Sequence, residues 1–509
     1  MKNQVKKIAA CTVLACMAVS AVGFAAPDDV QQNIKSVTMS QQAEAANTKA
    51  PKYVFLFIGD GMSYPQIQSA SYYLGANAGN GGVQTEELSF MDFPVAGSAQ
   101  TFDSTSFCPD SASTATSIAT GHKTYSGTIN MDTTFTKSFE TIAEKLKEQK
   151  DYKIGIVTSV NLNHATPAAF YAHQKSRSSY YEIGQELIAS NFDYFAGGAL
   201  LKPTGSNGDQ ESLYSLAEKS GYQVIDNQKD AEALKAADGK AIVIAETLAD
   251  SDSMSYALDA ETKEWQLADY VKKGIEVLDG NKGFFMMVEG GKIDWACHAN
   301  DAGSTISDTV AMSEAVDAAI EFYNQHPDET LIIVTGDHET GGLTIGYAGT
   351  DYDTYLTNLN NQKISYAKYD EDYVANYKAN KTSFEDAMKD VKKLFGLMLP
   401  GDADADKNPD LVLTDYEVDK LKTAYQKTLL DKGSKDYSQA EYVLYGTYEP
   451  FSVTVTHILN NKSGINFASY AHTGLPVPVF AQGAGSSSFE GYYDNTDVYN
   501  KMAALLQVK

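Results

Sequence analysis

Four short apolar runs, each followed closely by glycine or by acidic or histidine residues, constrain the fold of this chain more than any other feature. They lie in residues 53–63 (YVFLFIGDGMS), 152–170 (YKIGIVTSVNLNHATPAAF), 283–298 (GFFMMVEGGKIDWACH) and 330–342 (TLIIVTGDHETGG). A continuous apolar run that ends at glycine is typical of a strand buried on both faces. Helical patterns lie between the runs, for example in residues 267–278. The alternation predicts an α/β fold, a three-layer sandwich in which helices flank a large, mostly parallel sheet.

The polar residues of these runs follow the carboxyl ends of the predicted strands, where open parallel sheets bind their ligands. A further histidine precedes the apolar segment after residue 473. Mixed Asp and His sites suit zinc, and sites with oxygen ligands alone suit magnesium. The set is large enough for more than one metal ion. The candidate ligands are Asp60, Glu289, Asp294, His298, Asp337, His338 and His472.

Each of these signals has an ordinary structural explanation when it is taken alone. Asp294 and His298 are spaced i, i+4 and share a helix face, but an Asp in a first helical turn is common. Asp60 between two glycines suits a tight turn as well as a cation. Only the combination of the segments at one sheet edge favours a metal centre over a set of polar turns.

The segment at residues 107–127 (FCPDSASTATSIATGHKTYSG) consists mostly of small and hydroxyl residues. It is open whether this segment is a loosely packed surface helix or presents a reactive hydroxyl. A serine beside a metal centre can act as a metal-activated nucleophile.

The N-terminus predicts export. Residues 1–26 combine a basic start with an apolar run that ends in small residues, as in a signal peptide, and residues 27–50 read as a flexible linker. A lipoprotein cleavage box that ends at Cys16 is a weaker alternative. We therefore expect a periplasmic or extracellular protein. No other segment has the roughly 20 apolar residues of a membrane span, so we expect no transmembrane span in the mature chain.

Charge and cysteine content narrow the function further. The formal net charge of −26 disfavours binding to nucleic acid or anionic membranes, and an anionic substrate would need local positive charge such as bound metal. Outside the predicted signal only Cys108 and Cys297 remain, and the sequence leaves open whether they pair or are simply buried.

Residues of about 345–455 depart from the strand and helix alternation. This stretch is rich in Tyr, Lys, Asp and Asn, and we interpret it as an insertion that forms a cap or crown on the sheet. Within it, DADADKNPD begins like a calcium loop, but Lys407 and Leu413 stand where such a loop has Gly and Glu. A polar turn before a helix that Thr414 caps, with Glu417 as its capping-box partner, fits better.

Six motifs in this order (GDGM, PDSASTAT, HATPAAFYAHQKSR, VEGGKIDWACH, GDHETGG and AHTG) resemble the alkaline phosphatase family. The resemblance spans residues 53–472 and leaves residues 51–509 as one catalytic domain. It implies two zinc ions and one magnesium ion. The implied ligands are Asp294, His298 and His472 for the first zinc, Asp60, Asp337 and His338 for the second, and Asp60, Thr166 and Glu289 for magnesium.

The resemblance also implies roles for the substrate-binding residues. Ser111 is the nucleophile that becomes phosphoserine, Arg177 binds two phosphate oxygens, and Asp110 orients that arginine. Without the resemblance, Asp110 reads as a helix N-cap, Thr166 as an N-cap before Pro167, and Arg177 as a solvated charge.

Two positions vary within the family. His164 stands beside the implied magnesium site, in its second shell, where some members have Asp. Trp295 follows Asp294 within reach of the phosphate, where others have Lys or His. These residues leave the metal preference of the magnesium site open.

The implied activity is broad hydrolysis of phosphate monoesters at alkaline pH. The two zinc ions would stabilise the attacking and leaving oxygens of an in-line displacement. Members of this family are often dimers, so a homodimer is a candidate assembly. A sulfatase is disfavoured because CPDSA lacks the Pro and Arg of the C-x-P-x-R segment, and a diesterase because Arg177 is present. A binding protein that has lost catalysis is disfavoured by the intact Ser111.

Overall fold

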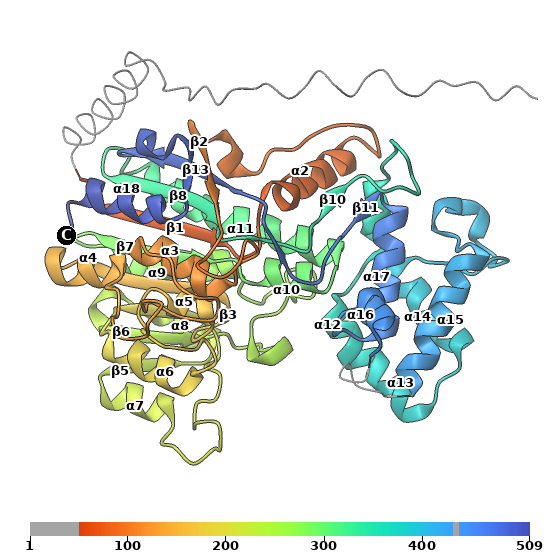
Figure 1. The fold of residues 1–509 in the computed structure, drawn as a ribbon, viewed down its shortest axis with the longest axis horizontal. Helices are drawn as coiled ribbons and strands as arrows, with labels where there is room; N and C mark the ends of the chain where they lie inside the picture. The colour runs from red at the N-terminus through yellow and green to blue at the C-terminus, as the bar shows by residue number, and fades with distance from the viewer. Residues whose placement is uncertain (1–49, 431–436) are drawn as a thin grey trace, which may run out of the picture. The chain divides into compact units, whose positions relative to one another are not determined.

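The computed structural model describes residues 50–430 and 437–509. Within them, ten strands form one sheet in the order β14-β2-β13-β8-β1-β7-β3-β4-β6-β5 (Figure 1). The four predicted strands are its centre and run parallel to one another. They are β1 (Tyr53–Gly59), β3 (Lys153–Asn161), β7 (Phe284–Glu289) and β8 (Thr330–Gly336).

The sheet is mostly parallel, as predicted, with one antiparallel strand. On one side of the centre, β4 (Tyr194–Gly198), β6 (Lys240–Ile244) and β5 (Tyr222–Ile225) continue in parallel. On the other side, β13 (Val477–Gly483) runs antiparallel to both β8 and β2 (Val95–Gln100). The strand β14 (Gly491–Asp494) then pairs with β2 in parallel at the edge.

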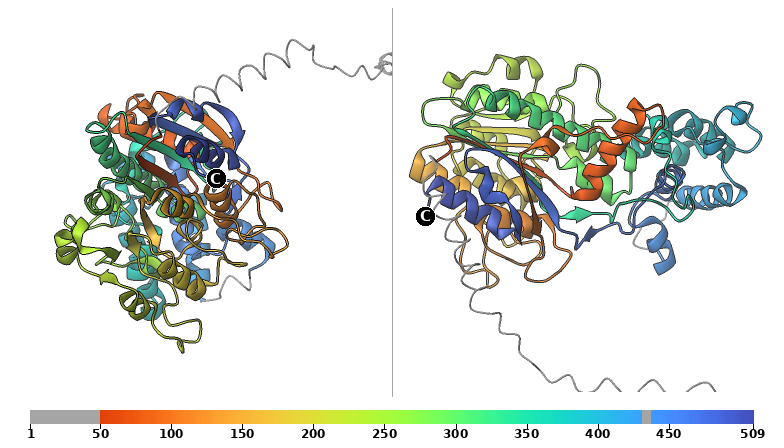
Figure 2. Two further views of the ribbon diagram at one scale, coloured as in Figure 1. Left: turned by 90° about the vertical axis from the view of Figure 1, so that its left-hand side faces the viewer. Right: turned by 90° about the horizontal axis from the view of Figure 1, so that it is seen from above.

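Helices cover both faces of the sheet and make the three layers that the sequence predicts (Figure 2). On one face, α2 (Tyr64–Ala78) and α9 (Leu267–Leu278) pack against the long helix α11 (Ala302–Tyr323). On the other, α3 (Ser111–Thr120) contacts α4 (Ile142–Lys150), α5 (Ala165–Ala168) and α18 (Thr496–Leu506). The predicted amphipathic segment 267–278 coincides with α9, which buries Leu267, Val271 and Leu278 among its apolar residues.

Shorter elements connect these layers. They are η1 (Ser89–Asp92), α6 (Tyr180–Ala189), α7 (Leu213–Lys219), α8 (Gln228–Ala233), η2 (Ala236–Asp238), η3 (Asp250–Asp252), α10 (Lys292–His298), β9 (Glu339–Thr340), β12 (His472–Thr473) and η9 (Ser486–Phe489).

The described residues of 345–455 add no strand to the ten-stranded sheet. Their secondary structure consists of helices joined by loops, and the last of these helices, α17 (Pro450–Lys462), continues beyond residue 455. The two-stranded ladder of β10 (Thr344–Ile345) and β11 (Ile465–Asn466) joins the two ends of the region. The elements are η4 (Leu356–Asn361), α12 (Tyr366–Tyr369), η5 (Asp370–Val374), α13 (Ala375–Asn380), α14 (Phe384–Phe395), η6 (Ala405–Lys407), η7 (Pro409–Leu411), α15 (Asp415–Leu429), α16 (Gln439–Tyr445) and α17 (Pro450–Lys462).

The predicted capping box in this region is confirmed. Thr414 is the N-cap of α15, its hydroxyl accepts from the Glu417 amide, and the Glu417 side chain accepts from the Thr414 amide. The acidic stretch before it folds as the two short turns η6 and η7.

The predicted signal peptide (1–26), its alternative box at Cys16, and the predicted linker (27–50) lie outside the described residues, apart from Ala50. In the part of the chain that is described, no helix combines the length and apolarity needed to cross a bilayer. Cys108 is exposed and Cys297 is buried, and the two thiols do not pair.

Candidate active site

Three carboxylates meet at the carboxyl edge of the sheet because their strands are neighbours. Asp60 follows β1 and Asp337 follows β8, and the last residues of these two strands, Gly59 and Gly336, lie side by side in register. Glu289 ends β7, opposite Ile58 of β1. Parallel pairing therefore places these side chains together, as the sequence predicts.

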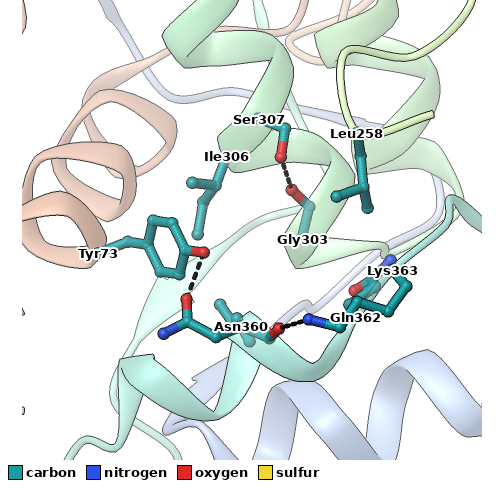
Figure 3. Close-up of a pocket in the computed structure, with 9 residues that line it drawn as sticks. Tyr73, Leu258, Gly303, Ile306, Ser307, Asn360, Gln362 and Lys363 are labelled. Atoms are coloured by element: carbon teal, nitrogen blue, oxygen red, sulfur yellow. Dashed lines mark hydrogen bonds between the residues drawn. The ribbon is translucent and has the colours of Figure 1, made fainter. Parts of the chain in front are cut away.

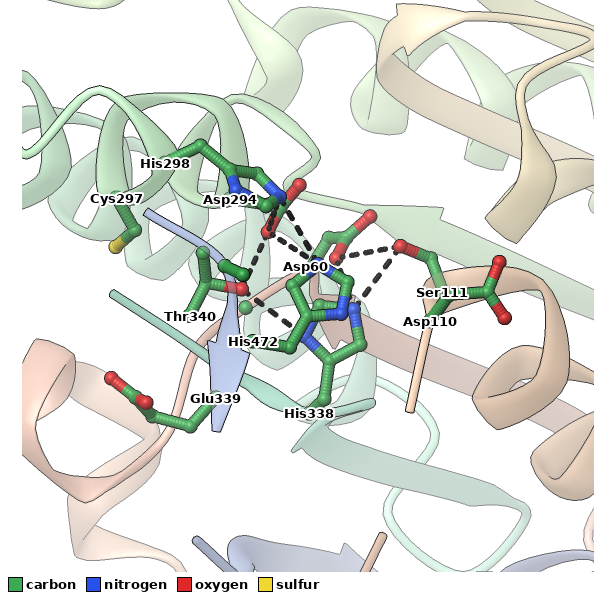
Figure 4. A network of polar contacts seen from close by, with 12 residues as sticks. Asp60, Asp110, Ser111, Asp294, Cys297, His298, His338, Glu339, Thr340 and His472 are labelled. Carbon is green, nitrogen blue, oxygen red and sulfur yellow. Dashed lines mark hydrogen bonds and ion pairs between the residues drawn. The ribbon is translucent and has the colours of Figure 1, made fainter. Parts of the chain in front are cut away.

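The first group of candidate ligands is Asp60, Asp337 and His338, all fully or almost fully buried (Figure 4). His338 Nε2 lies 3.2 Å from Asp60 Oδ1 and 3.4 Å from Asp337 Oδ2. Adjacent residues on a strand point to opposite faces, but Asp337 and His338 lie in the turn between β8 and β9, and both side chains enter one cluster. These three residues are suited to hold one zinc ion.

The second group comes from the helix α10 and the short strand β12. His298 Nε2 lies 3.3 Å from Asp294 Oδ1 and 3.1 Å from His472 Nε2, and the latter nitrogen lies 3.6 Å from Asp294 Oδ1. One helical turn brings Asp294 and His298 to the same face, as their spacing predicts. The other ring nitrogens bond to backbone carbonyls, His298 Nδ1 to Tyr470 at 2.6 Å and His472 Nδ1 to Pro109. Such bonds orient imidazoles for a metal. This group is therefore suited to the other zinc ion, which the sequence analysis names as the first.

The third group contains Asp60, Thr166, Glu289 and His164. Thr166 Oγ1 donates to Asp60 Oδ2 at 3.2 Å, and a ring nitrogen of His164 lies within 4.8 Å of carboxylate oxygens of Asp60 and Glu289. Glu289 Oε1 and His164 Nδ1 are buried and have no hydrogen-bond partner. Orphaned buried polar atoms of this kind point to an ion or water beside them. The sequence predicts His164 beside the magnesium ligands, and its ring lies close to two of them, Asp60 and Glu289.

The crowding of carboxylates shows in their ionisation. Burial raises the pKa of Asp60 well above its usual range, and repulsion from Asp337 and Asp294 adds to this effect. Burial likewise raises the pKa of Glu289 to about 8 and that of Asp337 to about 7. Without a cation these acids would hold protons near neutral pH. Bound metal ions are the natural compensation for such a cluster.

Ser111 is the first residue of α3, so the helix dipole favours negative charge beside its hydroxyl. Its Oγ lies 3.1 Å from His338 Nε2 and 3.5 Å from Asp60 Oδ1, and Figure 4 shows the hydroxyl directed at the first ligand group. The small residues behind it are fully buried, so α3 is not a loose surface helix. Of the crowded hydroxyls, Ser111 is positioned for chemistry.

Arg177 and Asp110 form an ion pair beside Ser111. Arg177 Nη1 donates to Asp110 Oδ2 at 2.9 Å, while Asp110 Oδ1 accepts from the amides of Gly127 and Ser113. Burial opposes the ionised form of Asp110, but Arg177 and these amides outweigh it and lower the pKa of the carboxyl. Asp110 is thus both the N-cap of α3 and the partner of the arginine, and Arg177 is not a solvated charge. Arg177 is also the only arginine in the sequence.

Thr166 and Trp295 complete the predicted set. Thr166 is not the N-cap of α5, which is His164, and its hydroxyl serves Asp60 instead. The ring of Trp295 meets that of His164 edge to face, with centroids 5.8 Å apart, and His164 Nε2 lies 3.4 Å from Arg177 Nη2.

Three supporting residues escaped the sequence analysis. Thr340 Oγ1 donates to Asp294 Oδ1 at 2.6 Å and lies 3.2 Å from His338 Nδ1, so it links the first two groups of candidate ligands. Thr158 donates to Glu289, which faces it across the pairing of β3 and β7. Glu339 accepts from Gln66 and from Thr473, next to His472. Each sits within two residues of a candidate ligand or opposite one on a neighbouring strand, which is the signal that could have identified it.

A cavity of about 510 Å³ lies away from these groups, where α2, α11 and η4 meet (Figure 3). Tyr73, Gly303, Gln362 and Lys363 are among its lining residues, and none of the candidate ligands lines it. Reactive groups are therefore concentrated in the compact polar cluster rather than in this cavity.

Comparison with known proteins agrees with the geometry. A family model described as alkaline phosphatase matches residues 51–508. Alkaline phosphatase 4 of Bacillus subtilis (strain 168) is 30% identical over 517 aligned residues, which cover 100% of this chain and 97% of that protein. The crystal structure of a cold-active alkaline phosphatase from Shewanella sp. superposes with a TM-score of 0.72 at 26% identity and covers 89% of this chain and 99% of that one. A mutant of TAB5 alkaline phosphatase with Mg bound in its M3 site shares the fold, with a TM-score of 0.61 and 22% identity over 91% of this chain and 100% of that one.

Proposed function

The chain belongs to the alkaline phosphatase family of phosphomonoester hydrolases, and on this premise we propose that it is an exported enzyme that works through a phosphoserine on Ser111 with two zinc ions and one magnesium ion. The observation that carries the proposal is the position of the Ser111 hydroxyl next to His338 and Asp60, while Asp110, the residue before Ser111, is paired with Arg177. The export part rests on residues 1–26, and the N-terminal residue of enzyme recovered from the culture medium or periplasm would check it.

The donor set fits the proposed metals. Asp60, Asp337 and His338 would hold one zinc and Asp294, His298 and His472 the other, while Asp60, Glu289 and Thr166 would hold magnesium. The buried atoms Glu289 Oε1 and His164 Nδ1, which have no hydrogen-bond partner, support a cation in the third group. A TAB5 alkaline phosphatase mutant in which glutamate replaces a histidine has magnesium bound in its M3 site, and this supports magnesium for a third group rich in carboxylates. When bound, the ions supply positive charge and lower the pKa of nearby hydroxyl groups and water.

The residues of the chain then account for each step. Arg177, oriented by Asp110, binds phosphate oxygens with its planar fork of N–H donors. Ser111 Oγ loses its proton to solvent and attacks phosphorus, and the bond from phosphorus to the ester oxygen breaks as the new O–P bond forms. The departing alkoxide takes a proton from solvent. Water then attacks the phosphoserine opposite Ser111 Oγ, from the side that the alkoxide left, and this releases inorganic phosphate and returns a proton to the Ser111 hydroxyl.

The first prediction concerns Arg177, the only arginine. Phenylglyoxal, which modifies arginine, should inactivate the enzyme with one modified residue per chain, and inorganic phosphate should protect it. The variant Arg177→Ala should raise both KM and the phosphate inhibition constant by roughly tenfold to a hundredfold, because a charge-assisted bidentate contact is lost. Mass spectrometry and steady-state kinetics provide the measurements.

The matched control is Arg177→Lys, which keeps the positive charge but lacks the planar pair of N–H donors of the guanidinium. It should recover only part of the phosphate affinity, since a lysine cannot reproduce bidentate binding. Full activity in the phenylglyoxal-modified protein would contradict the role of Arg177.

The second prediction is that protein stripped of metal becomes less stable as the pH rises from about 6.5 to 8.5. Folded Glu289 and Asp337 have raised pKa values of about 8 and about 7, whereas the unfolded chain ionises them near the ordinary 4.5 and 3.8. In this window the folded state binds more protons, so the free energy of unfolding falls with rising pH, by on the order of 2 kcal/mol. Burial lowers the pKa values of His164 and His338, so at these two residues the unfolded state binds more protons than the folded state. The free energy of unfolding therefore rises with pH on their account, but only below about pH 6.5.

Thermal unfolding of EDTA-treated protein across this pH range would measure the effect. Protein loaded with zinc and magnesium should not show the loss, because the metals keep the carboxylates ionised. The variant Glu289→Gln should weaken the pH dependence of the stripped protein. A stripped protein that gains stability between pH 6.5 and 8.5 would contradict the charge assignment.

A further inference from the structure

Lys292 is a buried cation next to the proposed metal site. It opens α10, two residues before Asp294, and its side chain is fully buried. A buried ammonium is costly unless it is well compensated, so its surroundings are informative.

Two aromatic rings provide much of the surroundings of this ammonium. Lys292 Nζ lies 3.8 Å from the centroid of Tyr256 and 4.6 Å from that of Trp295. It also donates to Ser253 Oγ at 2.9 Å and lies 3.6 Å from Asp250 Oδ2. A desolvated cation over an aromatic face is attracted to the ring, and this attraction restricts the orientation of the ring.

Acidic groups on neighbouring elements balance this charge. Asp250 lies in η3 and Asp308 in α11, and Asp259 follows the segment that carries Tyr256. Burial lowers the pKa of Lys292, and these three carboxylates raise it again. The aromatic rings therefore contact a lysine whose charge is compensated by carboxylates outside the candidate ligand set.

The second ring leads to the phosphate residues. Trp295 meets His164 edge to face at 5.8 Å, and His164 Nε2 lies 3.4 Å from Arg177 Nη2. The guanidinium of Arg177 is fixed from one side by Asp110 and is contacted by His164 on another. A displaced Trp295 would leave His164, and hence this second contact of Arg177, without lateral support.

We propose that Lys292 is a positioning residue for phosphate binding: its ammonium fixes the indole of Trp295 against His164 and so holds Arg177 in place. The proposal rests on the proposed phosphatase function and adds a specific contributor to phosphate affinity. Lys292 itself need not touch the substrate.

The sequence allows a direct optical test, because Trp265 and Trp295 are the only tryptophans. In a Trp265→Phe background, fluorescence reports on Trp295 alone. Trp265 contacts Tyr270 and lies outside the chain of contacts described above. Inorganic phosphate should change the emission of Trp295, and Lys292→Met should both shift the emission and weaken the phosphate titration. The expected rise in the phosphate dissociation constant is about tenfold, as expected for loss of a desolvated cation–π contact.

Kinetics separate positioning from general stability. Lys292→Met should raise KM and the phosphate inhibition constant by a similar factor, while kcat changes less than either. Lys292→Arg keeps a cation over the rings and should restore most of the affinity. Lys292→Gln, which is neutral but can still bond Ser253, provides the same test if Lys292→Met does not fold.

Lys273→Met is the matched control. Lys273 is also buried and donates to backbone carbonyls of Glu232 and Leu234, without contact to the site. It should lower the melting temperature without affecting phosphate affinity. If folded Lys292→Met and Lys292→Gln bind phosphate as the background protein does, the proposal is wrong. If the Trp265→Phe protein loaded with zinc and magnesium hydrolyses no monoester, the proposed function fails instead.

Discussion

Substitution of Ser111 by alanine is expected to abolish the phosphoenzyme and to lower kcat/KM for p-nitrophenyl phosphate by roughly a thousandfold or more. The reason is that the hydroxyl at the start of α3 is placed 3.1 Å from His338 Nε2 and is the proposed attacking group. Acid quenching after brief reaction with labelled substrate, followed by peptide mass spectrometry, should locate the phosphate on Ser111 in the unsubstituted enzyme.

Ser117→Ala is the matched control on the same helix. Ser117 is fully buried, and its hydroxyl bonds only within α3, to the carbonyl of Ser113. This variant should lose some stability but keep the phosphoenzyme and most of the activity. A Ser111→Ala enzyme that hydrolyses the ester as fast as the parent would overturn the mechanism.

Removal of the metal ions is expected to have a comparable effect. EDTA should reduce activity to background, and zinc with magnesium should restore it, because the proposed displacement needs the positive charge of the ions, and without them Asp60, Glu289 and Asp337 hold protons near neutral pH. Metal analysis of the active protein should find two zinc ions and one magnesium ion per chain. The melting temperature should fall when the metals are removed, since they bind only the folded state.

Single variants can assign the ions to their sites. His298→Ala should lose one zinc and Glu289→Gln the magnesium. His457→Gln is the matched control, because His457 lies in α17 and bonds Asn300 Oδ1 outside the ligand groups. Full activity in protein shown to be free of metal would contradict the proposed cofactors.

The sequence predicted the centre of the fold because its strands carry a strong local signal. Buried parallel strands need continuous apolar residues, and β1, β3, β7 and β8 have them. The apolar segment after residue 473 also forms a strand, β13, but its antiparallel pairing and the small ladders β10–β11 and β9–β12 have no local signature, because pairing depends on residues far apart in the chain.

The site was predictable to the extent that its residues stand at strand ends. Asp60, Glu289 and Asp337 could be placed at one edge of the sheet from strand order alone. Arg177 is the only arginine in 509 residues, yet without the resemblance its local sequence suggests only a solvated charge. The bond between Arg177 and Asp110 spans 67 positions and could not be derived from local pattern.

The sequence by itself determined which residue types were available and on which elements they stand, because hydrophobic period, capping and ligand chemistry are local properties. Only the tertiary structure decided how they combine. It brought the candidate ligands together in overlapping groups, with His338 close to both Asp60 and Asp294 and His164 close to Asp60 and Glu289, and left Cys108 and Cys297 apart. It also placed Lys292 over Trp295. These outcomes depend on distances between side chains that strand register and helix packing set across hundreds of residues, and no local pattern encodes them.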